Sequence, residues 1–336
     1  MDKLKLAYFG TPGFSAQFLE NLLTQIAIKH LIAIELVVTQ PDRPVGRKQA
    51  LTPSPVKKIA EKYNLPVITD LKMFNVKNSV FNEIDLALIY FYGQIIPKQL
   101  LSTPNYGFWN IHFSLLPKLR GPTPAVYSLI LGDRNTGVSL MQTDEKMDHG
   151  NLIAQVEVAI KPDETKVELE ERLHNHGLNL FIEQINNLLH NKIKFTPQDH
   201  SKTTYTRFPT KADGFIPLAV LKKALNNESI TFEELPKIIF EYIKKYNLIS
   251  NWKLELGNSA KIIYNYFRGL YPWPGIWTLV KITETPHFAK ASRGKEKRLK
   301  ITGADLIDGR FVIRKVQLEG KKEVNFSTFN QAYRIF

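Results

Sequence analysis

The first 190 residues alternate short apolar strands with amphipathic helices, and this alternation limits the possible folds more than any other feature. Segments 3–9, 33–39 and 85–91 have strand patterns, whereas 14–29 and 56–63 carry apolar residues at helical spacing. The run 85–91 (DLALIYF) is almost wholly apolar, as in a strand buried on both faces of a sheet. Repeated strand–helix units predict a Rossmann-like α/β domain with a doubly wound, mostly parallel sheet.

The turn after the first strand does not indicate a dinucleotide cofactor. Residues 10–13 are GTPG rather than G-x-G-x-x-G, and no acidic residue ends the strand at 33–39. Residues 152–160 alternate in the manner of an antiparallel edge strand. The other expected strands are 66–69, 109–113 and 137–143, and the other expected helices are 72–80, 123–131 and 167–189.

The chain of 336 residues is too long for one ordinary core, which predicts two domains. We expect a first domain at 1–190, a linker at 191–214 with little periodicity, and a second domain at 215–336. The second domain should be a small OB-like β-barrel with a helical insertion near 218–246. Its strands are expected at 261–267, 277–282, 298–301 and 311–318.

Positive charge is concentrated in the last third of the chain. The net charge is +13, and residues 201–336 hold 24 Lys and Arg against 12 Asp and Glu. The first 200 residues are nearly neutral, with 21 basic and 20 acidic residues. This asymmetry indicates a polyanionic partner such as a nucleic acid, although many basic proteins bind none.

The composition also limits the possible chemistry and the possible cellular location of the protein. The absence of cysteine excludes disulfides, thiolate metal sites and a cysteine nucleophile. The N-terminus lacks a basic region followed by an apolar one, so no secretory signal is expected. The longest apolar run, 86–96, is about half of a membrane span. We therefore predict a cytoplasmic protein, and we expect a monomer.

The stretch 109–121 (WNIHFSLLPKLRG) is the strongest candidate for a site. Side chains alternate along a strand, so Asn110 and His112 should point the same way, roughly 7 Å apart. The strand then ends in the turn 114–117. Ligands of open α/β sheets bind at the carboxyl ends of strands. The structural alternative is a half-buried, hydrogen-bonded histidine without a catalytic role.

A second candidate is the loop at 40–55 (QPDRPVGRKQALTPSP). It holds four prolines and three cations, which are Arg43, Arg47 and Lys48. Prolines should stiffen it without giving it regular structure. Loops of this length in a compact domain are usually functional, and a plain solvated loop is the alternative.

Several motifs together resemble a known family. Asn110-x-His112, then Ser114-Leu115-Leu116-Pro117, and further along Asp148-His149-Gly150 resemble formyltransferases that use 10-formyltetrahydrofolate. Other stretches are similar to the methionyl-tRNA formyltransferase family in particular, and the resemblance covers nearly the whole chain. These stretches are 9–14 (FGTPGF), 39–47 (TQPDRPVGR), 52–57 (TPSPVK), 92–97 (YGQIIP) and 272–277 (PWPGIW).

The resemblance implies transfer of a formyl group to the α-amino group of methionyl initiator tRNA, for translation initiation. It implies catalytic roles for Asn110, His112 and Asp148, and no metal. The folate is expected to bind residues of two turns, and the tRNA is expected to bind the 40–55 loop and the basic second domain. The expected folate-binding residues are Ser114, Leu115, Leu116, Pro117, Tyr92, Gly93, Gln94 and Ile95, and the expected tRNA-binding residues are Arg43, Arg47 and Lys48.

Some positions depart from the family pattern, and two other functions remain open. Phe113 and His149 stand where the family often has small residues, so they affect the surroundings of His112. One alternative function is a formyltransferase for an amino sugar nucleotide, which does not explain the basic last third. The other is a non-catalytic RNA-binding protein on the same scaffold, although all three catalytic positions hold competent residues.

Overall fold

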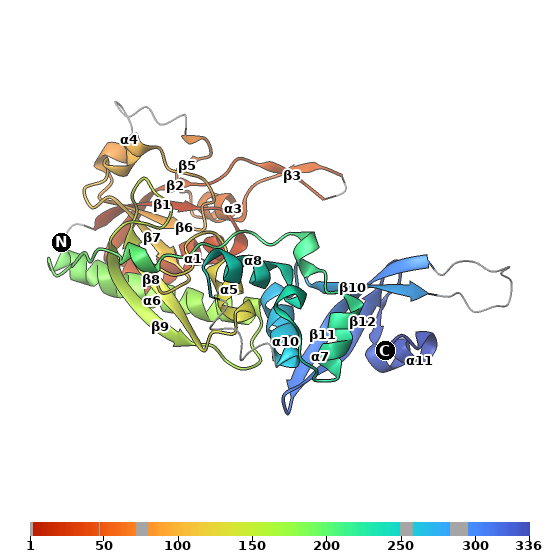
Figure 1. The fold of residues 1–336 in the computed structure, drawn as a ribbon. Coiled ribbons are helices and arrows are strands. Elements are labelled where there is room, and N and C mark those ends of the chain that lie inside the picture. The colour runs from red at the N-terminus through yellow and green to blue at the C-terminus, as the bar shows by residue number, and fades with distance from the viewer. Residues whose placement is uncertain (1–2, 47, 72–79, 249–257, 283–294) are drawn as a thin grey trace. The chain divides into compact units, whose positions relative to one another are not determined.

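The structure is a computed structural model that describes residues 3–46, 48–71, 80–248, 258–282 and 295–336 (Figure 1). It forms two compact units. The first unit comprises 1–121, 137–158 and 171–205, and the second comprises 122–136, 159–170 and 206–336. The chain therefore passes between the units more than once. The continuous boundaries at 190 and 215 stay a prediction.

A seven-stranded sheet organises the first unit, within the described residues. The first five strands across it run parallel, and β8 runs antiparallel to β7. This arrangement confirms the predicted Rossmann-like, mostly parallel sheet. In order across the sheet the strands are β5 (Val67–Ile68), β2 (Ile32–Val38), β1 (Leu4–Gly10), β6 (Leu86–Tyr90), β7 (Phe108–His112), β8 (Asn135–Gln142) and β9 (Leu152–Ala159).

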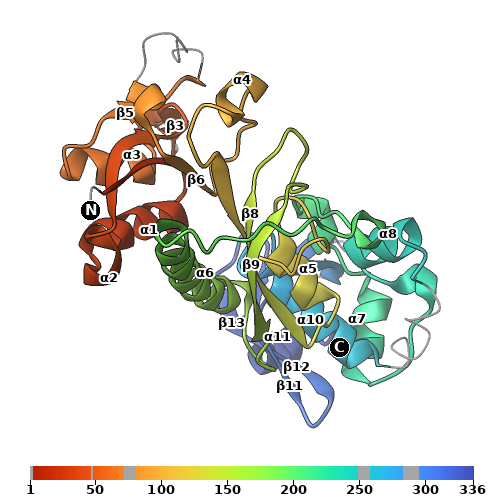
Figure 2. The ribbon, with the colours of Figure 1, turned by 90° about the vertical axis from the view of Figure 1, so that its left-hand side faces the viewer.

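Helices cover the two faces of this sheet (Figure 2). On one face, Phe18 of α1 (Gly13–Thr24) packs against Tyr90, and Phe181 of α6 (Lys166–Leu189) packs against Trp109. On the other face, Phe81 and Leu100 join a buried cluster with strand residues such as Phe9. They come from the 3-10 helix η2 (Val80–Glu83) and from α4 (Lys98–Leu101). Alternate residues of each strand thus supply two separate cores.

The remaining elements of the first unit are short. The helices α2 (Ile26–Lys29) and α3 (Pro55–Lys62) flank β2 and β5 in the sequence, and η3 (His200–Lys202) lies in the expected linker. The helix expected at 72–80 lies, except for its last residue, outside the described residues. The loop 40–55 contains a hairpin of β3 (Arg43–Val45) and β4 (Ala50–Thr52). The expectation that it lacks regular structure was therefore wrong, because Gly46 at φ +74° allows a tight turn.

The second unit contains a separate antiparallel sheet, consistent with a small β domain. Its strands in order are β10 (Ile276–Ile282), β11 (Lys295–Ile307), β12 (Arg310–Leu318) and β13 (Glu323–Asn325). Its helices are α5 (Pro124–Ile130), η4 (Lys211–Gly214), α7 (Leu218–Leu225), η5 (Phe232–Glu234), α8 (Lys237–Lys245), α10 (Ser259–Leu270) and α11 (Phe326–Tyr333).

One expected strand is wrong, because residues 261–267 lie within helix α10. The β-branched and aromatic residues of this segment favour strands when each residue is considered alone. In the structure they are buried around the whole circumference of the helix, between α5, α7 and the sheet of the second unit. Tertiary burial therefore overrides local propensity here. Among the described residues, no helix is long and apolar enough to cross a bilayer.

Candidate active site

Strand β7 places Asn110 and His112 near the carboxyl end of the parallel strands. Asn110 lies opposite Ile89 of β6 and Met141 of β8, and His112 lies opposite Ser139. Their strand neighbours are buried, and His112 itself is only 6% exposed. The two polar side chains are thus held on a rigid element, two residues apart on one face.

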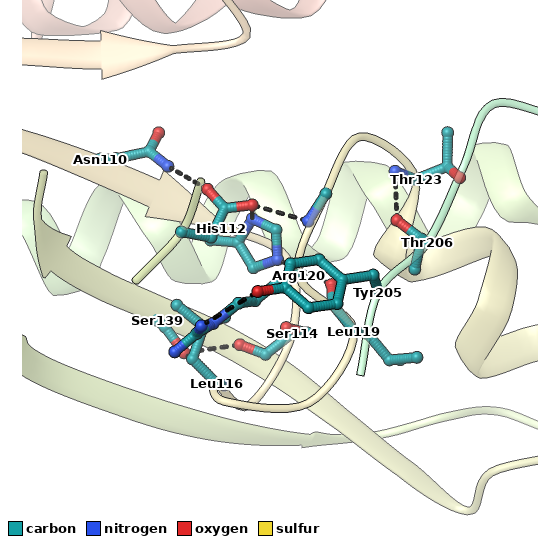
Figure 3. Close-up of polar contacts among 12 residues, drawn as sticks. Asn110, His112, Ser114, Leu116, Leu119, Arg120, Thr123, Ser139, Tyr205 and Thr206 are labelled. Carbon is teal, nitrogen blue, oxygen red and sulfur yellow. Dashed lines mark hydrogen bonds and ion pairs between the residues drawn. The ribbon is translucent and has the colours of Figure 1, made fainter. Parts of the chain in front are cut away.

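Asp148 joins this pair from the loop after β8. Figure 3 shows Asn110 and His112 at this site. The amide Nδ2 of Asn110 donates to Oδ1 of Asp148 at 3.4 Å, and Nδ1 of His112 lies 3.8 Å from Oδ2. The side chain of Asp148 is 14% exposed. Its backbone has φ +49°, a conformation that L-residues seldom adopt and that aspartate tolerates better than most. The structure therefore brings together the three residues expected to be catalytic.

The turn after β7 fixes the tautomer of a neutral His112. Its Nε2 lies 3.0 Å from the carbonyl oxygen of Leu119, which can only accept a hydrogen bond. Nε2 therefore carries the proton, and Nδ1 is left with a lone pair on the side of Asp148. Such a nitrogen can accept a proton and then form an ion pair with the carboxylate.

Gly121 supplies a main-chain donor to the same carboxylate. Its N–H donates to Oδ2 of Asp148 at 2.6 Å. Gly121 has φ +102°, which only glycine adopts readily, and this conformation belongs to the turn that presents its N–H. A hydrogen bond to an ionised carboxylate typically stabilises by about 1.5–3 kcal/mol. The donor therefore holds the carboxylate of Asp148 in place.

The turn 114–117 is held by its own side chains and by β8. The hydroxyl of Ser114 donates to the carbonyl of Lys118, and the hydroxyl of Ser139 donates to the carbonyl of Ser114. Ser114 and Leu116 are buried, whereas Leu115 and Pro117 are partly exposed. Any ligand at this turn is therefore met by backbone and by the two partly exposed side chains.

The four residues expected to bind folate in the turn after β6 differ from one another in exposure. The carbonyl of Tyr92 accepts from Thr11 Oγ1 at 2.8 Å and from Gln40 Nε2 at 2.9 Å. The ring of Tyr92 is 1% exposed and packs in the core, and burial raises the pKa of this phenol to about 12. Gly93 and Gln94 are exposed, and Ile95 is 86% exposed. Because its ring is buried, Tyr92 presents only its main chain at the edge of the sheet.

The hairpin β3–β4 presents Arg43 and Lys48 to solvent. Arg47, the third expected tRNA-binding residue, lies outside the described residues. Val45 and Leu51 on this hairpin are 56% and 70% exposed. The register pairs Val45 with Ala50 and Leu51 with Pro44, so these two apolar side chains point to opposite faces of the hairpin, and Arg43 shares the face of Val45.

Sequence patterns did not identify several residues around Asp148. Buried Arg120 donates to Gln198 Oε1 at 2.6 Å, to His200 Nδ1 at 2.9 Å and to the Tyr205 hydroxyl at 3.4 Å. Gln198 donates in turn to the carbonyl of Asp148. Arg120 lies in the stretch 109–121 but was given no role from the sequence, and the others lie about 80 residues later without a local signal.

The two unusual residues near the pair have defined surroundings. The ring of Phe113 packs edge-on against Tyr90 and Phe91, with centroids 6.0 and 5.2 Å away. His149 Nδ1 lies 2.6 Å from Asp144 Oδ2. The ring of His149 also stacks on His200 with centroids 4.0 Å apart. Phe113 therefore fills core space, and His149 contacts the expected linker.

The described part of the chain contains no group of three or more histidine, aspartate or glutamate side chains that could hold an ion. The arrangement of Asn110, His112 and Asp148 instead offers one amide donor, one proton acceptor and one fixed negative charge. Such a set can stabilise a developing oxyanion and remove a proton from an attacking amine.

Comparison with known proteins gives the class. Residues 4–185 match the model of the Formyl transferase family, so the chain is a formyl transferase by class. Curated methionyl-tRNA formyltransferases are similar over almost the whole length. The relative from Bacillus cytotoxicus is 33% identical, covering 97% of this chain and 95% of the relative. The relative from Caldicellulosiruptor saccharolyticus is 31% identical, covering 99% and 98%. The chain belongs to the methionyl-tRNA formyltransferase family.

Solved structures share the fold at low sequence identity. An N-formyltransferase from Helicobacter canadensis, solved with folinic acid and dTDP-3-aminofucose, is 19% identical with a TM-score of 0.54. The alignment covers 94% of this chain and 99% of that one. A 4-N formyltransferase from Francisella tularensis is 17% identical with a TM-score of 0.52, covering 82% and 93%. These similarities support the Rossmann-like formyltransferase fold alone.

Proposed function

We propose that the protein transfers a formyl group from 10-formyltetrahydrofolate to the α-amino group of methionyl initiator tRNA. The observation that carries this proposal is the meeting of Asn110, His112 and Asp148 in a chain similar throughout to methionyl-tRNA formyltransferases. Its substrates place it in the cytoplasm. The product, N-formylmethionyl-tRNA, serves translation initiation.

Asn110 acts on the developing oxyanion. When the amine nitrogen attacks the formyl carbon, the carbonyl electrons move to oxygen, and the Nδ2–H of Asn110 donates to that oxygen. One N–H of this amide points to Asp148 Oδ1 at 3.4 Å, and the second N–H is the donor for the substrate oxygen. A neutral donor on a rigid strand stabilises such charge by about 3–4 kcal/mol.

His112 and Asp148 take the proton. The tetrahedral centre bears a positively charged nitrogen, and Nδ1 of His112 has the free lone pair to accept its proton. Asp148 stabilises the imidazolium that results. The centre then collapses, the bond from carbon to N10 breaks, and N10 receives the proton held by His112 as tetrahydrofolate leaves. The second carboxylate oxygen, bonded to Asn110, positions that amide at the same time.

Substrate binding uses the turns and the basic surfaces. We assign the folate to the sheet edge at 92–95 and 114–117, where it meets main-chain groups and the partly exposed Leu115 and Pro117. The tRNA acceptor end is assigned to the hairpin with Arg43, because a guanidinium pairs bidentately with phosphate or a base edge. The cations of 201–336 contact the phosphate backbone, which positions the tRNA independently of its sequence.

One assay tests the function. The purified protein is incubated with 10-formyltetrahydrofolate and charged initiator tRNA, and the esterified amino acid is analysed for a formyl group. Formylmethionine is the expected product. Formylation of an amino sugar nucleotide instead of the tRNA would support the sugar alternative. Binding of tRNA with no product from either acceptor would support the non-catalytic alternative.

A further inference from the structure

The segment 196–205, expected to be part of a linker, is hydrogen-bonded to the start of β9 at one end and to the turn after β7 at the other. Leu152 and Thr196 exchange two backbone hydrogen bonds of 2.8 Å each. At the other end, Thr204 accepts from the N–H of Arg120 at 2.8 Å and, through its hydroxyl, from the N–H of Leu119 at 2.9 Å. A connection that merely joins two units needs no such pairing.

Gln198 lies in the middle of this segment and is 6% exposed. Its Oε1 accepts from Arg120 at 2.6 Å, while its Nε2 donates to the carbonyls of Asp148 at 3.0 Å and Gly150 at 2.7 Å. A guanidinium only donates and a carbonyl only accepts, so these partners fix the orientation of the amide. The oxygen and both N–H groups each have a partner.

The partners of Gln198 lie in the two segments that set the position of the Asp148 carboxylate. Arg120 immediately precedes Gly121, whose N–H donates to that carboxylate at 2.6 Å. The other partners are the main-chain carbonyls of Asp148 and Gly150, in a turn where Asp148 has φ +49°. One buried amide therefore connects the donor and the acceptor of the same hydrogen bond. A conformation of this kind persists when its surroundings hold it.

The residue two positions later contacts the same turn. His200 Nδ1 lies 2.9 Å from the guanidinium of Arg120, and its ring stacks on His149. Desolvation, together with the charges of nearby His149 and Arg120, lowers the pKa of His200. A neutral His200 can accept from Arg120, so it adds a second contact between the segment and Arg120.

We propose that Gln198 is a positioning residue for formyl transfer, which holds Asp148 in register with Asn110 and His112 by joining the Asp148–Gly150 turn to Arg120. This inference rests on the proposed function. It extends the active site to a segment beyond residues 4–185, which match the family model.

The test replaces Gln198 by methionine, which is similar in length and forms none of the three hydrogen bonds. We expect kcat for formyl transfer to fall about 10- to 100-fold, the range typical of residues that orient metal ligands through hydrogen bonds. KM for tRNA and for 10-formyltetrahydrofolate should stay within twofold, because Gln198 touches neither substrate. A residue that only stabilised the fold would leave kcat of the folded fraction unchanged.

A second variant tests the hydrogen bonds of the amide nitrogen apart from that of the amide oxygen. Gln198→Glu keeps an acceptor for Arg120 but turns a carboxylate toward the two carbonyls, so kcat should fall as well. Gln184→Met is the matched control, since Gln184 is buried to a similar degree, at 7% exposure, and lies in α6. Its kcat should match the unmodified protein. Thermal melts establish that each variant is folded.

The outcomes keep the two proposals apart. An unmodified protein that forms no formylmethionyl-tRNA refutes the proposed function. An active unmodified protein with a folded Gln198→Met variant of equal kcat overturns the positioning role, as does a change confined to KM. If the methionine variant does not fold, Gln198→Glu decides by the same criterion.

Discussion

Single side chains in this site are constrained from several directions. Asn110 is fixed by a central strand and points to the carboxylate of Asp148, which also accepts from the N–H of Gly121. The identities of Asn110 and His112 and their common face could be predicted from alternation along one strand. The nearness of Asp148 could not, because it depends on how a loop after β8 returns to β7.

Replacing Asn110 by alanine should lower kcat about 100-fold or more, because a preorganised donor to an oxyanion is lost. KM for both substrates should change little, since the donor acts mainly on the transition state. Steady-state formylation assays measure both constants. Asn105→Ala, at an exposed position, is the control and should be unaffected. A wild-type kcat in the Asn110 variant would contradict the oxyanion role.

Replacing Arg43 by alanine should lower kcat/KM for the tRNA about 10-fold while leaving the folate Kd unchanged. The expected loss corresponds to about 1–3 kcal/mol for a bidentate guanidinium contact. Titration of folate and initial rates at varied tRNA measure the two quantities. Lys58→Ala, an exposed cation on α3, serves as control. Weakened folate binding in the Arg43 variant would refute the assignment of the hairpin to tRNA.

The burial of a whole helix depends on tertiary contacts that local sequence patterns do not reveal. Helix α6 was correctly predicted from its period, but its His174 is 1% exposed against the sheet. The ring contacts Phe18, and its Nδ1 lies 3.0 Å from the Tyr90 hydroxyl. Helix α10 was mistaken for a strand because its β-branched and aromatic residues favour strands, although Lys261, Asn265 and Arg268 have helical spacing.

His174 should make stability depend on pH. Burial lowers the pKa of His174 from 6.5 to about 4, so the unfolded chain binds its proton more readily. Stability is therefore complete above pH 6.5 and declines as pH falls toward 4, by up to about 3 kcal/mol. Urea unfolding at several pH values should show a flatter dependence in His174→Gln. The exposed His190→Gln should retain the full dependence, and an unchanged slope in His174→Gln would exclude this origin.

At the scale of the whole molecule, charge is divided between a nearly neutral first part and a basic last third. Residues 201–336 fall mostly in the second unit, which carries the antiparallel sheet. Such a surface binds a polyanion with release of counterions, so affinity depends steeply on salt. The charge division could be predicted from the sequence. The membership of segments 122–136 and 159–170 in the second unit could not.

Neutralising exposed lysines of the second unit should flatten the salt dependence of tRNA binding. The slope of log K against log[salt] should decrease by about 0.9 for each phosphate contact removed. Filter binding or fluorescence anisotropy between low and moderate salt measures it. The substituted lysines are Lys281, Lys321 and Lys322, each changed to glutamine.

The matched control neutralises three exposed lysines of the first unit to the same net charge. Its slope should stay near that of the unmodified protein, because those positions lie outside residues 201–336, to which the phosphate contacts are assigned. Equal flattening in both variants would mean that only total charge matters. The control positions are Lys3, Lys29 and Lys58.

The α/β class, the family and the pair Asn110 and His112 could be predicted from the chain before it folds. Those features are periodic or local, and period and spacing do not depend on tertiary contacts. The link that Gln198 makes between Arg120 and the Asp148 turn became visible in the folded protein alone. A buried amide is placed by partners 50 and 78 residues away, and its hydrogen bonds leave no pattern in the neighbouring sequence.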